Sequence, residues 1–213
     1  KEHADVSGIR VQCLGLPIGK LPLADAAGEP ARLRRAVEIA RLAGTARLRV
    51  FAPQTDDGDA CLALLREWRT IAEDAGMILL LENDARYWNA FPENARRMFG
   101  ELGSPHFRAA FDFANTVQIG YGPADWFPWL VPHLDTLHMK DAKRDGTVTP
   151  VGEGDGDVEP TLKTLSEAGW SGPLTLEPHL STAGPFAGTS GEALFTVATN
   201  ALRLMATRAG ILV

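Results

Sequence analysis

The stretch that decides the fold is Met-Ile-Leu-Leu-Leu-Glu at residues 77–82, a short apolar run that ends on a carboxylate. Five consecutive apolar residues leave no polar face, so the run is typical of a strand buried on both sides, as in a parallel sheet. The preceding stretch, 59–75, has apolar residues at helical spacing and stops at Gly76. The two segments together predict a sheet whose strands alternate with helices.

The same alternation continues along the chain in both directions. We predict strands at 9–16, 47–52, 77–82, 107–113, 134–140 and 173–177, and helices at 31–42, 59–75, 92–102, 123–131, 159–168 and 191–209. Six βα units imply parallel pairing, because a crossover helix is the usual link between parallel strands. An open doubly wound sheet and a closed barrel both fit this pattern. No glycine-rich nucleotide loop follows the first strand, which argues against a dinucleotide-binding protein.

Length and composition narrow the class of protein. A chain of 213 residues fits a single domain, 1–213, and its net charge of −6 argues against nucleic acid as the main partner. No apolar run approaches the ~20 residues of a membrane span. The first residues carry no signal-peptide pattern, and two cysteines do not make a disulfide framework. We therefore expect a cytoplasmic enzyme.

Four of the six predicted strands finish on a residue that can bind a metal ion: Glu82, Asp112, His138 and Glu177. Their spacings of 30, 26 and 39 residues are each about one βα unit. Each of the four alone could be a helix cap or a hydrogen-bonded histidine, but four in register are hard to explain in that way. In a barrel these strand ends would meet at one mouth, where three carboxylates would repel each other without a cation. The residue types suit Mn²⁺, Co²⁺, Mg²⁺ or Zn²⁺, and the lack of thiolates argues against a structural zinc.

Sequence segments at these strand ends resemble a known family. They are LLLEND (79–84), FDFAN (111–115), LHMKD (137–141), PVGEGDGD (150–157) and LTLEPHL (174–180). On these segments the chain resembles the xylose isomerase-like TIM-barrel superfamily, in particular its sugar phosphate isomerase/epimerase branch. The resemblance covers nearly the whole chain from about residue 8. It implies a TIM (β/α)8-type barrel in which about six βα units are visible and the first two are missing, so we expect a partner, a swapped element or a further N-terminal segment to cover the strand edges.

The resemblance also implies a site and a reaction. A single divalent ion, Mn²⁺ by preference, would be bound by Glu82, Asp112, His138 and Glu177. The two glutamates would also act as the acid/base pair, one on each face of a carbon next to a carbonyl. The ion would polarise the carbonyl and stabilise an enediolate, which lets ordinary carboxylates remove the proton. The expected function is isomerisation or epimerisation of a sugar, a sugar phosphate or a keto-polyol.

Four further residues are candidates for substrate binding. Lys140 would face the same mouth as His138 on the period of two of a strand. Arg144 occupies a position at which related epimerases place a substrate-binding arginine, and His179 follows the last ligand closely. Asn115 stands where those enzymes commonly have a histidine. Asparagine can bind a hydroxyl group but cannot exchange protons, which argues against true ketose 3-epimerase activity.

Three alternatives to an isomerase differ in what they require of the sequence. A metal-dependent lyase, either a dehydratase or a β-eliminase, would begin with the same proton abstraction, and Asn115 favours it slightly. A DNA-repair enzyme like endonuclease IV would need about three zinc ions and many histidine ligands, which this acidic chain lacks. A non-catalytic barrel subunit would not need the four ligands. We expect a small carbohydrate-like substrate, no nucleic-acid or membrane partner, and a chain that could form a homo-oligomer.

Overall fold

Strands and helices alternate along the chain in the order that the sequence predicts. The computed structural model describes residues 2–181 and 190–211, and the chain divides into two compact units, Lys1–Ala110 and Phe111–Val213. Every predicted helix is present, with ends within two residues of the expected ones. That the chain acts as one domain stays a prediction.

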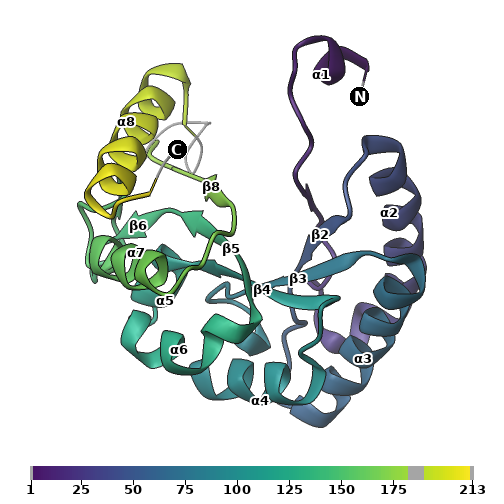
Figure 1. Cartoon of the computed structure of the whole chain (residues 1–213). Coiled ribbons are helices and arrows are strands. Elements are labelled where there is room, and N and C mark those ends of the chain that lie inside the picture. Colours follow the sequence, from purple (N-terminus) through teal and green to yellow (C-terminus); the bar gives the residue numbers. More distant parts are fainter. Residues whose placement is uncertain (1, 182–189, 212–213) are drawn as a thin grey trace. The chain divides into compact units, whose positions relative to one another are not determined.

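The first unit carries four strands and the helices that connect them. In chain order its elements are α1 (Glu2–Val6), β1 (Leu14–Gly15), η1 (Leu23–Gly28), α2 (Glu29–Ala43), β2 (Arg47–Val50), α3 (Gly58–Ala75), β3 (Ile78–Glu82), η2 (Trp88–Ala90), α4 (Pro92–Leu102) and β4 (Phe107–Asp112), whose last two residues belong to the second unit. Helices α2, α3 and α4 lie along one side of β2, β3 and β4 (Figure 1).

The second unit continues the alternation with shorter elements. They are α5 (Phe113–Val117), α6 (Pro123–Leu130), η3 (Val131–His133), β5 (Leu134–Met139), β6 (Asp141–Ala142), β7 (Val148–Thr149), α7 (Val158–Glu167), β8 (Leu174–Leu176) and α8 (Glu192–Arg208). Helix α8 contacts both α7 and β8. The small strands β6 and β7 pair with each other antiparallel and form a separate ribbon.

The main sheet has six strands in the order β1-β2-β3-β4-β5-β8. Neighbouring strands pair in parallel, as in β2 with β3 and β5 with β8. In the register of β3 and β4, Glu82 is opposite Ala110, so Asp112 lies two residues further along its strand. The carboxyl ends of these strands therefore carry the acidic residues that the sequence places there.

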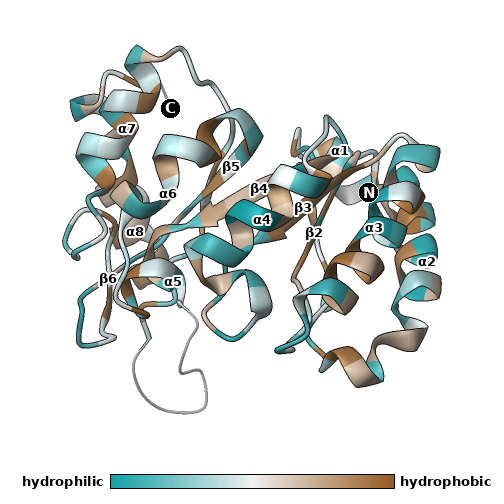
Figure 2. Ribbon diagram, turned by 90° about the horizontal axis from the view of Figure 1, so that it is seen from below, coloured by the Kyte–Doolittle hydropathy of each residue, from teal (hydrophilic) through white to brown (hydrophobic). Residues whose placement is uncertain are grey.

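Burial follows the hydrophobic pattern of the sequence. Leu79, Leu80 and Leu81 on β3 are at most 1% exposed, as expected of a strand covered on both faces. On α3, Trp68 is fully buried on the apolar stripe of the helix. Figure 2 shows the strands as largely hydrophobic, whereas the helices carry both hydrophilic and hydrophobic segments. None of the described helices is both long and apolar enough to span a membrane.

Several local features differ from the sequence prediction. The first strand is limited to Leu14–Gly15 instead of 9–16, because only these two residues pair with β2. The apolar side chain that suggested an earlier start, Ile9, is 62% exposed. The sequence also did not predict the β6–β7 ribbon or α5, which are too short to carry a periodic signal.

Candidate metal centre

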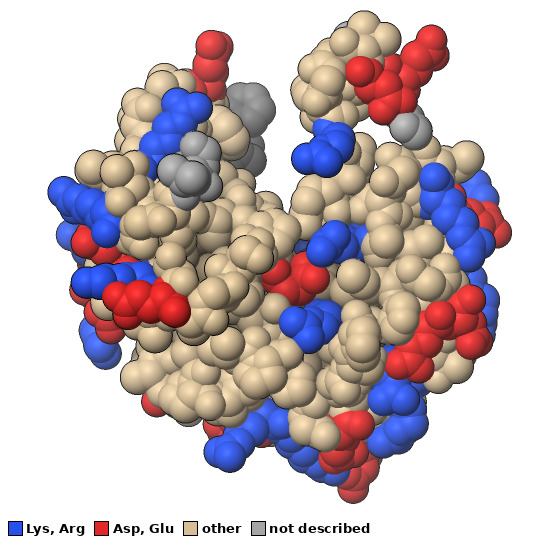
Figure 3. Space-filling view, in the orientation of Figure 1, with Lys and Arg blue, Asp and Glu red and all other residues tan. Residues whose placement is uncertain are grey.

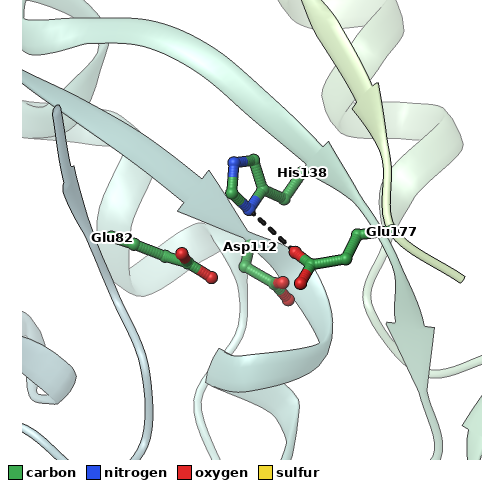
Figure 4. Close-up of side chains that lie close together, drawn as sticks. All are labelled: Glu82, Asp112, His138 and Glu177. Carbon is green, nitrogen blue, oxygen red and sulfur yellow. Dashed lines mark ion pairs between the residues drawn. The ribbon is translucent and has the colours of Figure 1, made fainter. Parts of the chain in front are cut away.

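The four predicted ligands all lie at the carboxyl ends of strands. Glu82 and Asp112 are the last residues of β3 and β4, His138 is the next-to-last residue of β5, and Glu177 follows β8 directly. Each offers one ligand atom, and these four atoms lie within 4.8 Å of one another (Figure 4). The four residues therefore form a group that could hold a metal ion.

Glu82 is held in the first unit by an arginine on the neighbouring strand. The Arg49 Nε lies 3.1 Å from Glu82 Oε2, and the Glu82 side chain is only 4% exposed. The Asn89 amide donates a hydrogen bond of 3.0 Å to the Glu82 carbonyl, which fixes the backbone at the end of β3. The carboxylate thus has a compensating charge and a defined orientation.

Asp112 is fully buried in the second unit, and both of its oxygens have partners. Its Oδ1 accepts a hydrogen bond of 3.0 Å from the Asn115 backbone N–H, so Asp112 caps the short helix α5. Its Oδ2 lies 2.8 Å from the Lys140 ammonium, whose side chain is 7% exposed. Asn115 and Lys140, both predicted to bind substrate, therefore lie next to a proposed ligand.

The remaining two ligands contact each other. His138 Nδ1 lies 3.1 Å from Glu177 Oε2, and His179 Nε2 lies 3.3 Å from Glu177 Oε1 (Figure 4 shows the first of these ion pairs). Burial alone would raise the pKa of Glu177. The hydrogen bonds from His138 and His179 and the charge of Lys140 outweigh burial and hold this pKa far below its ordinary value. Glu177 is therefore ionised throughout the neutral and mildly acidic range.

The predicted substrate residue His179 contacts Glu177, whereas the Arg144 side chain forms no hydrogen bond or ion pair with the four ligands in the described part of the chain. His179 has a backbone φ of 45°, an uncommon value for a residue other than glycine, so the backbone turns sharply just past Glu177. Arg144 follows β6 in an exposed segment, and its backbone N–H donates to Asp155 Oδ2 at 2.8 Å. Its guanidinium group forms no ion pair within the part of the chain that the structure describes. Its role in substrate binding stays a prediction.

Two buried or half-buried charged residues near the ligands escaped the sequence analysis. Arg49 pairs with Glu82, as described above. Asp141, 1% exposed, accepts four backbone N–H bonds from Ala142 and from three glycines of the segment 150–157. The sequence did hold a signal for each of them. Arg49 is a charged residue within a strand, and Asp141 directly follows Lys140 just past the end of β5.

The types of ligand atom agree with a divalent cation. Three carboxylates and one imidazole, three of the four residues buried, provide oxygen and nitrogen donors without a thiolate. Lys140 and Arg49 neutralise part of the negative charge of the three carboxylates, and the group could hold a divalent cation.

Parallel strands with connecting helices, and a cluster of ligands at the carboxyl ends of the strands, define a protein of the βα-barrel class. A family model confirms this class over residues 1–196. The chain belongs to the xylose isomerase-like TIM barrel family.

Known proteins similar to this chain include sugar epimerases. The 2-epi-5-epi-valiolone 7-phosphate 2-epimerase of Actinoplanes sp. is 37% identical over 109 residues, which span 48% of this chain and 37% of that relative. The match therefore covers well under half of the relative's length.

Two solved structures share the fold at low sequence identity. A D-tagatose 3-epimerase-like protein has a TM-score of 0.78 and 18% identity, with 98% of this chain and 81% of that chain covered. The probable 3-DHS dehydratase of Bacillus anthracis has a TM-score of 0.75 and 15% identity, with 95% and 79% covered. At these identities the likeness shows the fold alone.

Proposed function

We propose that this chain is a metal-dependent isomerase or epimerase that transfers a proton next to the carbonyl group of a sugar, a sugar phosphate or a keto-polyol. The observation that carries the proposal is the group Glu82, Asp112, His138 and Glu177, whose ligand atoms lie within 4.8 Å of one another. The epimerase that is 37% identical to about half of this chain supports the same class of reaction.

The proposed roles follow from the contacts of each side chain. All four residues would ligate one divalent ion, with Mn²⁺ preferred over Co²⁺, Mg²⁺ or Zn²⁺. A divalent ion at this position would polarise the substrate carbonyl and make the neighbouring C–H more acidic. That acidification matters because Glu177, with its lowered pKa, is a weak base.

Glu82 and Glu177 are the proposed acid/base pair. One carboxylate would remove the proton from one face of the carbon, and the other would return a proton to the opposite face, which inverts the centre. His138 and His179, which hydrogen-bond Glu177, would orient its carboxylate. Lys140, Asn115, His179 and Arg144 remain the proposed substrate-binding residues.

A lyase is the second candidate, and Asn115 favours it. This side chain, in a buried segment next to Asp112, can bind a substrate hydroxyl but cannot return a proton. The same first step would then end in loss of a leaving group from the next carbon. The probable dehydratase among the solved structures shares the fold, so the fold itself does not favour either reaction.

Turnover in D₂O with added Mn²⁺ separates the two reactions. An epimerase or isomerase gives a product with deuterium on the carbon next to the carbonyl, whereas a dehydratase gives a product that has lost water. We expect Glu177→Gln to lower turnover by at least about a hundredfold, because it removes a proton-transfer group. Glu167→Gln, an exposed glutamate at the end of α7, is the matched control.

The proposal fails if Glu177→Gln and Glu167→Gln turn over the same sugar and sugar phosphate panel equally well. It also fails if the wild-type protein, loaded with Mn²⁺, exchanges no proton of any panel member with solvent.

A further inference from the structure

The ring of Phe51 contacts two cations of the first unit. Phe51 directly follows β2 and is 2% exposed. The Lys20 ammonium and the Arg49 guanidinium carbon each lie 4.7 Å from the centroid of its ring. Both contacts have the geometry of a cation–π interaction, so one aromatic side chain fixes the positions of two positive charges.

The backbone that carries Lys20 is tied to Phe51. The Phe51 N–H donates a hydrogen bond of 3.0 Å to the Ile18 carbonyl. Gly19 has a φ of 85°, and a Cβ at this position would lie 1.8 Å from the Phe51 carbonyl oxygen. Only glycine permits this approach, so the turn that follows β1 packs directly against the end of β2. This packing fixes the backbone position of Lys20.

Arg49 is placed with similar precision. A Cβ on Gly15 would lie 2.6 Å from an Arg49 terminal nitrogen, so the glycine on β1 leaves the space that the guanidinium group occupies. Arg49 is 20% exposed and reaches Glu82 with its Nε. Arg49 is thus a cation on the strand beside the one that carries Glu82, and part of its guanidinium group is still accessible to solvent.

The charges around this ring do not balance. Arg49 pairs with Glu82, but Lys20 has no carboxylate partner in the part of the chain that the structure describes. If the Glu82 carboxylate binds a metal ion, its charge no longer offsets that of Arg49. Lys20 and Arg49 are then two cations on the same ring without a balancing carboxylate. Arg49 is half-buried and Lys20 is exposed. Two cations on one aromatic ring create a local positive potential that attracts an anion.

We infer that Lys20 and Arg49 form a subsite for the phosphate monoester of a phosphorylated sugar. This inference rests on the proposed function. Arg49 contacts Glu82 at 3.1 Å, and Arg49 and Lys20 each lie 4.7 Å from the centroid of the Phe51 ring, so a chain of contacts within the first unit links Lys20 to Glu82. The carbonyl end of the substrate lies at Glu82, and its phosphate lies at Lys20, with Arg49 between them. Arginine and lysine are the two side chains that bind phosphate best.

Binding measurements test the subsite without any need for turnover. Calorimetric titration of the Mn²⁺-loaded protein uses inorganic phosphate, D-fructose 6-phosphate, D-fructose and D-galacturonate as probes. We expect Lys20→Gln to weaken binding of the phosphorylated probes by about tenfold, the typical effect of one charge-assisted contact. Binding of D-fructose stays unchanged. Lys163→Gln, an exposed lysine on α7, is the matched control and leaves all affinities unchanged.

The outcomes separate this inference from the proposed function. If no phosphorylated probe binds, or if Lys20→Gln and Lys163→Gln bind them equally, the phosphate subsite is wrong. A Lys20-dependent affinity for D-galacturonate that exceeds that for D-fructose 6-phosphate would overturn it in favour of a sugar acid. Lys20-dependent phosphate binding in a protein that fails the D₂O test would leave the subsite standing and refute the proposed reaction.

Discussion

Asp112 and Lys140 form a buried ion pair in which each side chain depends on the other. The two charged atoms are 2.8 Å apart, and their side chains are 0% and 7% exposed. A charge removed from water in this way is costly unless it is paired, so loss of one partner exposes the full desolvation cost of the other. The ammonium group also offsets part of the negative charge that the proposed ligands bring together.

Lys140→Met is therefore expected to destabilise the chelator-treated protein by about 3–5 kcal/mol, because it leaves the Asp112 carboxylate buried without its cation. Added Mn²⁺ should recover part of this loss, since the ion supplies the missing positive charge. Urea unfolding with EDTA and with Mn²⁺ measures both effects. Lys143→Met, at an exposed lysine three residues further on, is the control. Equal stability of the two variants in EDTA would show that the ion pair is not important for folding.

At the scale of elements, the glycine-rich segment 150–157 is organised by a carboxylate. Both Asp141 oxygens accept backbone N–H bonds from this segment, with N···O distances of 2.9–3.1 Å to Gly152, Gly154 and Gly156. A Cβ on Gly154 would lie 2.4 Å from Asp141 Oδ1. The glycines are needed because the chain packs closely around this side chain at the start of β6.

Gly154→Ala is expected to lower the free energy of unfolding by about 1–3 kcal/mol, as overpacking of a filled space does. Gly100→Ala provides the comparison, because this glycine lies in α4 and its Cβ would meet no atom within 4 Å. That change should be neutral or stabilising by up to about 1 kcal/mol. Thermal and urea unfolding of both variants measures the difference. Equal stability of the two variants would mean that the segment 150–157 has room for a Cβ beside Asp141.

The elements that the sequence predicted well are those with a long hydrophobic period. The strand 77–82 and the helix 59–75 differ from β3 and α3 by one residue at one end. The β6–β7 ribbon is only two residues long on each side, so its pairing depends on contacts with the rest of the second unit and leaves no pattern in the sequence. The segment 9–13 is not part of a strand, because the pairing with β2 begins only at Leu14.

At the scale of the whole molecule, the chain has a net charge of −6, but the face drawn in Figure 3 carries no single large acidic surface. Figure 3 shows acidic and basic side chains interspersed over the face in view. Three carboxylates lie at the strand ends together with His138. The sequence predicted this group because four of the six strands end on an acid or a histidine. The order of the strands made that prediction possible, because parallel strands end on one side.

What the sequence could not supply were the partners of these ligands. Arg49 reaches Glu82 across two neighbouring strands, and Lys20 reaches Phe51 from a different loop. Such pairs depend on register and on side-chain direction, neither of which is set by spacing along the chain. The only sign of such a partner in the sequence is a charged residue within an apolar strand, as Arg49 is in β2.

Metal titration of the chelator-treated protein tests the central claim most directly. We predict that calorimetry finds one Mn²⁺ per chain, and that Glu82→Gln, Asp112→Asn and Glu177→Gln each weaken its binding by at least about tenfold. Glu167→Gln should bind Mn²⁺ as the wild type does. If the wild-type protein binds no divalent ion, or if the three ligand variants bind it as tightly as Glu167→Gln, the metal centre proposed for this chain is wrong.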